Sequence, residues 1–152
     1  KRTMKEGTMK EGTILKKDVM ITVDSKQEHP EQEPEVMNFI TEGTYSKKDN
    51  CYCITYDESP VTGLDGTTTT MEIASDSVTL IRYGNVSSLM VFEKGRKHTS
   101  EYNTEYGIFA VGVTARKLNV ELNDHGGHFD IEYVLEVNNQ VTSFTTLNVK
   151  VQ

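Results

Sequence analysis

Hydrophobic and polar residues alternate through most of this chain, and this period of two restricts the fold to β-structure. In the clearest run, residues 128–137, the hydrophobic side chains Phe129, Ile131, Tyr133 and Leu135 are separated by mostly polar neighbours. Strict alternation is typical of strands with one buried face and one solvated face. No segment shows a convincing helical period, so we expect an all-β domain with little or no helix.

Turn-forming residues separate the alternating runs at intervals of about 8–12 residues, as in an all-β meander. Gly84-Asn85 and Asn138-Asn139 are examples, and glycine and asparagine supply the positive φ angles of tight hairpins. The pattern predicts strands at residues 18–25, 35–46, 50–56, 67–75, 77–83, 87–93, 97–104, 107–115, 116–123, 128–137 and 140–151. Short connections imply consecutive antiparallel pairing, and closure removes exposed edges. We therefore expect an antiparallel up-and-down barrel of about 8–10 strands.

The regular members of the alternating sets are expected to line the core of this barrel. They are Val19, Ile21, Val23, Leu80, Val91, Leu118, Val120, Phe129, Ile131, Tyr133, Leu135, Leu147 and Val149.

The length of 152 residues suits a single domain, which we place at residues 16–152. Residues 1–15 are set apart as a flexible N-terminal segment. They mix charged residues with glycine and threonine, and the run Met4–Thr8 is repeated as Met9–Thr13. The repeat is either a cloning artefact or a short genuine duplication, and it is too short to be a structural repeat.

The formal net charge of −7 disfavours nucleic acid as a partner, because tracking phosphates requires clustered Lys and Arg. No apolar run is long enough to span a bilayer, and residues 1–17 contain no apolar segment of the signal-peptide type. We therefore expect a cytoplasmic protein. Cys51 and Cys53 lie two residues apart on one strand, where a bridge would be strained, so two reduced thiols are expected.

A series of short motifs between residues 36 and 151 resembles the YwiB-like family of small bacterial proteins. The matching segments are Gly43-Thr44-Tyr45, Tyr56-Asp57-Glu58, Thr62-Gly63, Ile81-Arg82-Tyr83-Gly84, Phe92-Glu93-Lys94-Gly95, Tyr102-Asn103-Thr104-Glu105-Tyr106-Gly107, Gly126-Gly127 and Ile131-Glu132-Tyr133. The resemblance implies a calycin-like, or lipocalin-like, β-barrel. It implies no particular activity, and lipid and haem carriers are related to it only by analogy of fold.

Arg82 is the first candidate site residue, because it shares a strand face with Val78 and Leu80. Pointing inward, its guanidinium could bind a ligand carboxylate or phosphate. Alternatively it lies at the strand end, paired with a glutamate, and the rarity of unpaired buried arginine favours this position. An inward Arg82 requires an anionic partner. The candidates within the chain are Glu58, Glu72, Glu93 and Glu101.

His98, Ser100 and Tyr102 share one face of the strand predicted at residues 97–104 and form either a polar inner wall or, as polar residues usually do, a solvated outer face. The predicted ligand-binding set is therefore Arg82, His98, Tyr102 and Glu58. The segment Asp124–His128 contains metal-ligating residue types, but its Gly-Gly pair is more typical of a hairpin. We predict no metal site, no cofactor and no catalytic residue.

The leading functional hypothesis is a non-enzymatic binding module for a small anionic or lipid-like ligand, held inside the barrel. The alternative is a structural or interaction protein with a packed barrel that binds no small ligand and self-associates, for example as a homodimer. Met37, Phe39, Met90 and Phe92 would then matter, because they lie on strand faces opposite other apolar residues. An enzyme is less favoured, because no nucleophile, base and oxyanion site occur as a set.

Overall fold

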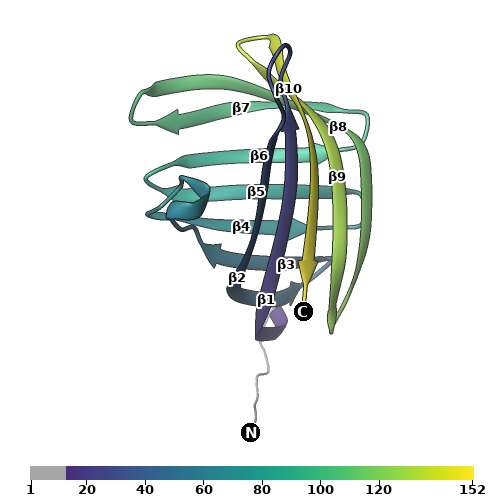
Figure 1. The fold of residues 1–152 in the computed structure, drawn as a ribbon. Helices are drawn as coiled ribbons and strands as arrows, with labels where there is room; N and C mark the ends of the chain where they lie inside the picture. The colour runs from purple at the N-terminus through teal and green to yellow at the C-terminus, as the bar shows by residue number, and fades with distance from the viewer. Residues whose placement is uncertain (1–12) are drawn as a thin grey trace, which may run out of the picture.

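The alternating runs form ten antiparallel strands in the computed structural model, which describes residues 13–152 (Figure 1). The strands are β1 (Thr13–Glu28), β2 (Glu35–Lys48), β3 (Cys51–Asp57), β4 (Thr67–Ile73), β5 (Ser77–Gly84), β6 (Ser87–Glu93), β7 (Lys97–Thr104), β8 (Gly107–Asn123), β9 (Gly126–Val137) and β10 (Gln140–Val151). A 3-10 helix, η1 (Pro60–Thr62), lies between β3 and β4. Within the described residues, no helix has the length and apolar composition to span a membrane.

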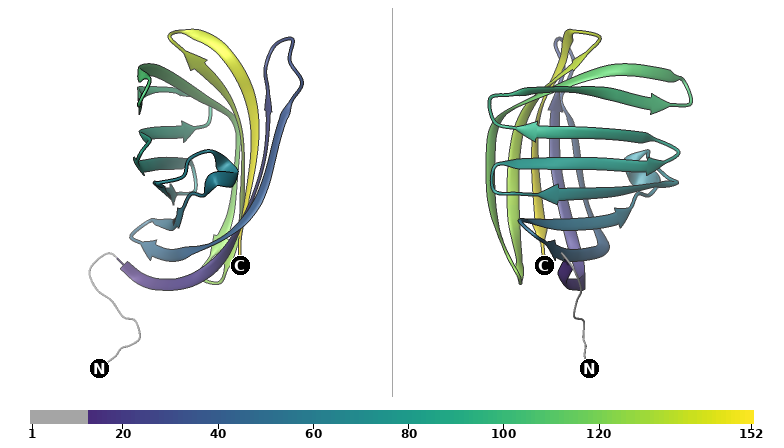
Figure 2. Two further views of the ribbon diagram at one scale, coloured as in Figure 1. Left: turned by 60° about the vertical axis from the view of Figure 1, so that its left-hand side comes forward. Right: turned by 180° about the vertical axis from the view of Figure 1, so that it is seen from behind.

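Each strand pairs with the next along the chain, and β1 pairs with β10 to close the barrel. The predicted all-β, antiparallel, up-and-down architecture is thereby confirmed. The strands on the two sides of the barrel cross at a large angle, and η1 lies at the end where β3 leads into β4 (Figures 1 and 2).

Strand β8 covers two of the predicted strands, residues 107–115 and 116–123, which are one continuous strand with a bulge between Ala115 and Lys117. Before the bulge Val113 and Ala115 are buried, and after it Leu118 and Val120 pack against the core. The extra residue moves the inward positions from odd to even numbers, and a bulge of this kind also bends the strand. The predicted boundary between residues 115 and 116 is therefore wrong: the change of parity there is a bend within one strand.

Strand β1 is longer than the predicted 18–25, because its pairing with β2 extends from Thr13 to Gln27. Residues 13–15 of the segment set apart at the N-terminus therefore belong to this strand, and residues 1–12 lie outside the described part of the chain. At the other end of the strand, Gln27 and Glu28 extend the pairing with β10.

Most of the predicted core residues are buried. Those with the lowest exposure are Val19, Ile21, Val23, Leu80, Phe129, Ile131, Leu147 and Val149, while Leu118, Val120, Tyr133 and Leu135 are partly buried against them. The prediction for Val91 is wrong: the register Val78↔Phe92 turns Phe92 inward and Val91 outward. Strand β6 is apolar at both parities, so its own sequence does not determine which face is inside.

One end of the barrel is sealed by stacked tyrosines. The ring of buried Tyr45 stacks on that of Tyr52, with centroids 5.1 Å apart and planes 9° apart. The Tyr45 hydroxyl donates to the carbonyl of Asn123 (2.7 Å), and the Tyr52 hydroxyl donates to Oδ1 of Asp124 (2.6 Å). These contacts join β2 and β3 to the β8–β9 turn across the end of the barrel.

Candidate functional site

The inner face of the barrel changes from apolar to polar along several strands at the same level. On β1 the inward residues Val19, Ile21 and Val23 are followed by Ser25 and Gln27. The same change occurs along β4, β5, β6 and β10. The inward residues, in order away from the sealed end, are Ile73, Met71, Thr69 and Thr67 on β4, Val78, Leu80 and Arg82 on β5, Phe92, Met90 and Ser88 on β6, and Val151, Val149, Leu147, Thr145 and Ser143 on β10.

Two adjacent cavities occupy this polar half of the barrel. The smaller chamber has a volume of about 190 Å³ and the larger chamber about 510 Å³, and Gln27, Arg82 and Tyr133 line both. The other residues of the smaller chamber are Val23, Ser25, Met37, Phe39, Tyr56, Glu58, Thr62, Leu64, Met71, Leu80, Thr145 and Leu147. Those of the larger chamber are Met90, Tyr102, Phe109, Val111, Leu135 and Val137.

Arg82 and Glu58 face each other in the smaller chamber. The Nε atom of Arg82 lies 4.0 Å from Oε2 of Glu58, whose side chain is only 2% exposed. The hydroxyl of Thr62 donates to Oε1 of Glu58 (2.8 Å), and that of Thr69 donates to Oε2. Because Thr62 ends η1, the buried carboxylate also holds this short helix at the open end of the barrel. Glu58 is thus the acidic partner that an inward Arg82 requires.

Three buried polar side-chain atoms in the described residues have no hydrogen-bond partner: Nε of Arg82, Oγ of Ser88 and Oγ1 of Thr145. Arg82 and Ser88 are directly paired across β5 and β6, while Thr145 lines the smaller chamber beside Arg82. Buried polar groups in folded proteins are almost always hydrogen-bonded, so an unpartnered cluster requires an explanation. All three atoms belong to the polar half of the interior.

Tyr56 and Tyr133 bring phenol groups into the same region. Burial raises the pKa of Tyr56 above its ordinary value, with a further increase from the Glu58 charge and a partial decrease from Arg82. Burial likewise raises the pKa of Tyr133, against smaller lowerings by the neighbouring Thr145 hydroxyl and by the Arg82 charge. Both phenols therefore remain neutral near pH 7 and carry hydroxyl protons that they can donate.

The structure brings together three of the four predicted site residues. Arg82 and Glu58 lie in the smaller chamber, and Tyr102 lines the larger one beside Arg82. His98, two residues before Ser100 on β7, lines neither chamber. Its Nε2 lies 2.9 Å from Oε1 of Glu93, at the end of β6 where backbone pairing with β7 is lost.

Sequence reasoning missed Gln27 and Thr145, although each continues an alternating set. Gln27 shares parity with Val23 and donates from Nε2 to Oγ of Ser143 (3.1 Å). Thr145 shares parity with Leu147. The signal was a polar residue extending an apolar face, the same signal that singled out Arg82.

The Asp124–His128 segment comprises the β8–β9 turn at Asp124-His125 and the first residues of β9, as expected of a hairpin. A Cβ on Gly127, whose φ is +137°, would lie 2.0 Å from the carbonyl oxygen of Glu121, so this close approach requires glycine. No group of three or more His, Cys, Asp or Glu side chains in residues 13–152 is arranged to hold a metal ion. Cys51 and Cys53 are both free thiols, and burial, followed by the influence of Cys51, raises the pKa of Cys53 to about 12.

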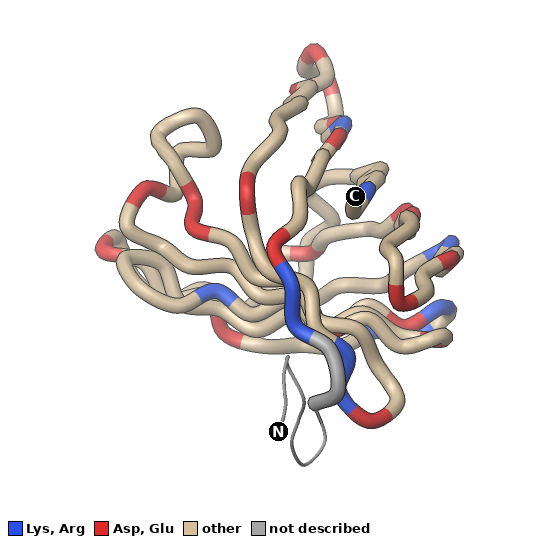
Figure 3. Tube along the Cα trace, turned by 90° about the horizontal axis from the view of Figure 1, so that it is seen from below, with Lys and Arg blue, Asp and Glu red and all other residues tan. Residues whose placement is uncertain are grey.

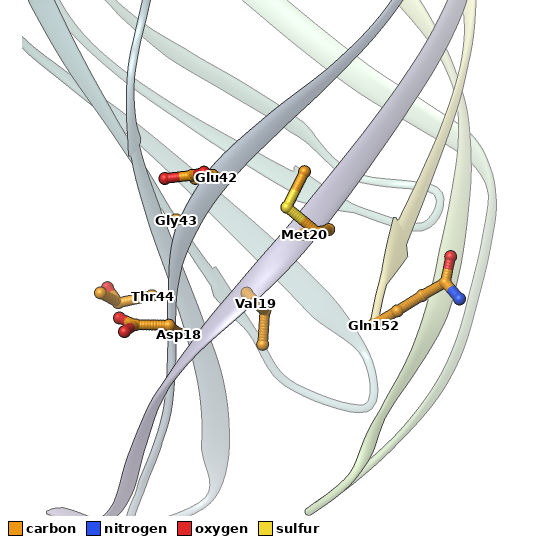
Figure 4. Close-up of a pocket in the computed structure, with 7 residues that line it drawn as sticks. All are labelled: Asp18, Val19, Met20, Glu42, Gly43, Thr44 and Gln152. Atoms are coloured by element: carbon orange, nitrogen blue, oxygen red, sulfur yellow. The ribbon is translucent and has the colours of Figure 1, made fainter.

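A further hollow of about 550 Å³ lies along β1 and β2 (Figure 4). Its lining includes the carboxylates of Asp18 and Glu42, together with Met20 and the C-terminal Gln152. None of its residues lines either inner chamber. Viewed from below, acidic residues are spread over many loops, and Lys and Arg form no continuous stripe (Figure 3).

Comparison with known proteins places the fold and the chambers in a family. The model of DUF1934, a domain of unknown function, matches residues 21–149. The chain belongs to this family. The match includes Arg82, Glu58 and Tyr102, so the two chambers are built within the DUF1934 domain.

The DUF1934 chain is similar in structure to the ywiB protein from Bacillus subtilis. The crystal structure of that protein matches with a TM-score of 0.74, covering 93% of this chain and 96% of the other at 18% sequence identity. At this identity the likeness establishes the fold alone, and the resemblance to the YwiB-like family is confirmed. No curated protein matches the chain.

Proposed function

We propose that this protein is a non-enzymatic binding module that holds one small amphipathic ligand in the open half of its barrel. The observation that carries the proposal is the cluster of unpartnered polar atoms on Arg82, Ser88 and Thr145. An unsatisfied buried donor or acceptor costs stability, so a fold retains several of them together where another molecule completes their hydrogen bonds. The polar head of the ligand would lie at this level.

The larger chamber supports an apolar body for the same ligand. Its volume of about 510 Å³ falls within the range of small-molecule sites, and its wall is mostly aliphatic and aromatic. Met90, Phe109 and Leu135 supply apolar surface, while Arg82 and Tyr102 supply the few polar groups that orient a ligand. A calycin-like carrier of a lipid-like molecule would likewise combine an apolar wall for the ligand body with a few polar groups for its head.

The open end also offers a route of entry, because its hairpin tips expose apolar side chains. The exposed large hydrophobic residues at this end are Val36, Val61, Tyr83, Tyr106, Ile108, Phe109 and Val141. The turns at the sealed end, at Asp49-Asn50, Ser75-Asp76 and Lys94-Gly95, expose none. An apolar rim lowers the cost of passing a hydrocarbon body from water to the chamber.

A thermal-shift measurement with decanoate tests the proposal, using Leu135→Trp to fill the larger chamber and Leu89→Trp as the matched control. Leu135 lines the chamber, whereas Leu89 is 47% exposed on β6. A ligand that binds only the folded state increases the free energy of unfolding, by about 2.7 kcal/mol when its concentration is 100 times its Kd. The midpoint temperature of unfolding rises as a result. We expect decanoate to stabilise the wild type and Leu89→Trp and to leave Leu135→Trp unchanged. An equal shift in both variants would contradict binding in the chamber.

Self-association is a second candidate, and the apolar rim favours it. The residues predicted to form the self-association surface point into the barrel and cannot contact a second copy. Met37, Phe39 and Met90 line the chambers, and Phe92 is buried in the core. Pairing of two copies would instead use the rim. Sedimentation equilibrium of the wild type and of Ile108→Ser distinguishes the two functions: a dimer lost in this variant supports self-association, and a monomer at all concentrations excludes it.

A further inference from the structure

We propose that the chambers select a ligand whose head carries a single negative charge, as a carboxylate does, over neutral heads and over doubly charged heads. The inference rests on the proposed function, since it concerns the same cavity. It follows from the positions of Arg82 and Glu58, the only two charged side chains among the described residues that line the chambers.

Arg82 has hydrogen-bonding capacity that the protein leaves unused. A guanidinium has five N–H donors, and none of the side-chain hydrogen bonds found in the described residues involves the Arg82 guanidinium. Its contact with Glu58, at 4.0 Å, is longer than a hydrogen bond. Arg82 lines both chambers whereas Glu58 lines only the smaller one. The guanidinium therefore presents donors to the larger chamber on a side that has no protein carboxylate.

A neutral head would satisfy these donors poorly. Hydrogen bonds between a guanidinium and a carboxylate are about twice as strong as neutral ones, and the planar fork of Arg82 matches a carboxylate in a bidentate arrangement. Gln27, Tyr102 and Tyr133 line the same chamber and can add neutral donors. Because burial raises the pKa of Tyr133, its hydroxyl keeps its proton and adds no negative charge.

A doubly charged head would be disfavoured by Glu58. This carboxylate is nearly inaccessible, is fixed by the hydroxyls of Thr62 and Thr69, and offsets part of the Arg82 charge. The attraction of the site for a ligand grows in proportion to the ligand charge, but the cost of taking that charge out of water grows with its square. With one guanidinium and one buried carboxylate, the second charge of a phosphate head has no partner.

Titration calorimetry with three ten-carbon probes tests this selectivity in the wild-type protein. The probes are decanoate, decanol and decyl phosphate at about pH 7.5, where a phosphate monoester is largely doubly charged. We expect decanoate to bind about tenfold more tightly than either of the others, a difference of about 1.4 kcal/mol. Equal binding of decanol, or tighter binding of decyl phosphate, would overturn the selectivity alone. Failure of all three probes to bind would overturn the proposed function with it.

Variants identify the residues responsible. Glu58→Gln removes the opposing charge and should improve the affinity of decyl phosphate about tenfold relative to that of decanoate. Glu136→Gln is the matched control, because Glu136 pairs with Lys97 (3.0 Å) and lines neither chamber. An unchanged ratio in Glu58→Gln would overturn the role of Glu58.

Arg82→Lys provides a second variant that keeps the positive charge and the pairing with Glu58 but removes the planar fork. We expect decanoate affinity to fall about tenfold while decanol affinity is retained. Full retention of decanoate binding by Arg82→Lys would show that the guanidinium does not receive the head.

Discussion

The two ends of the barrel are built from the same strands but differ in what those strands direct inward. Near the sealed end, Ile21, Ile54, Phe129 and Ile131 are completely buried and fill the interior. Near the open end, the same strand faces carry serine, threonine, glutamine and arginine around the smaller chamber, while the wall of the larger chamber is mostly apolar apart from Gln27, Arg82 and its tyrosines. The open end instead places polar groups where an apolar core would be more stable, which is the expected cost of a binding site.

The largest predicted difference between the two ends is in the effect of shortening an inward side chain. Phe129→Ala should lower the free energy of unfolding by about 3–5 kcal/mol, since Phe129 is completely buried. Met90→Ala should cost about 1 kcal/mol, because Met90 is only partly buried and already borders a cavity. Urea denaturation measures both. Equal losses would mean that the open end is as tightly packed as the sealed end.

Removing the partly buried cation Arg82 should give the next largest effect. Arg82→Met leaves the Glu58 carboxylate with its two threonine donors but without its positive partner, and we expect a loss of about 2 kcal/mol. The double variant Arg82→Met/Glu58→Met should recover most of this loss, because no charge is then left in the chamber. Denaturation of the single and double variants measures the coupling. If the double variant is less stable than either single variant, the Arg82–Glu58 pair stabilises the fold. The view that the pair is retained for ligand binding at a cost in stability would then be contradicted.

Alkaline pH should destabilise the protein through the buried tyrosines of both ends. Burial raises the pKa of Tyr56 above its ordinary value of 10.0, so the protonated phenol favours the folded state. This contribution is fully present below pH 10 and is lost as the pH rises from about 10 towards the higher folded pKa, by about 1 kcal/mol at pH 11. Unfolding measured from pH 8 to 11 should show a smaller decline in Tyr56→Phe. Tyr106→Phe is the control, since Tyr106 is 85% exposed, and a decline unaltered in Tyr56→Phe would contradict this assignment.

The contacts across the sealed end should have the smallest effect. Tyr52→Phe removes the hydrogen bond to Asp124 (2.6 Å) but keeps the stacking on Tyr45, so we expect a loss of about 0.5 kcal/mol. Thermal unfolding with and without Asp124→Asn isolates the pair. A loss of several kcal/mol would show that the sealed end depends on this hydrogen bond more than on the buried apolar residues.

The sequence was most informative where one strand face is apolar and the other polar. The alternation at Phe129, Ile131 and Leu147 determines which face is inside, so the strands and their closure could be predicted. It was least informative at Val91, because β6 is apolar at both parities and only its register with β5 decides the face. The bulge at residue 116 appeared in the sequence only as a change of parity between two expected strands.

For the candidate site, local pattern predicted inward residues but not their neighbours. Arg82 and Tyr102 were found because they extend inward-facing sets. The meeting of Arg82 with Glu58 depends on the path of the loop after β3, and sequence spacing left four glutamates as candidates. His98 has the same parity as Tyr102, but it lies towards the other end of β7 and contacts Glu93.

The most direct test of the difference between the two ends is a two-dimensional amide NMR titration of the wild-type protein with decanoate. We expect saturable shifts at residues around the chambers, including Gln27, Arg82 and Tyr133, and no shifts at Ile54 and Phe129 near the sealed end. This result would show that a ligand enters only the open half. Saturable shifts confined to the outer hollow at Asp18 and Glu42, or no shifts at millimolar decanoate, would contradict a binding site inside the barrel.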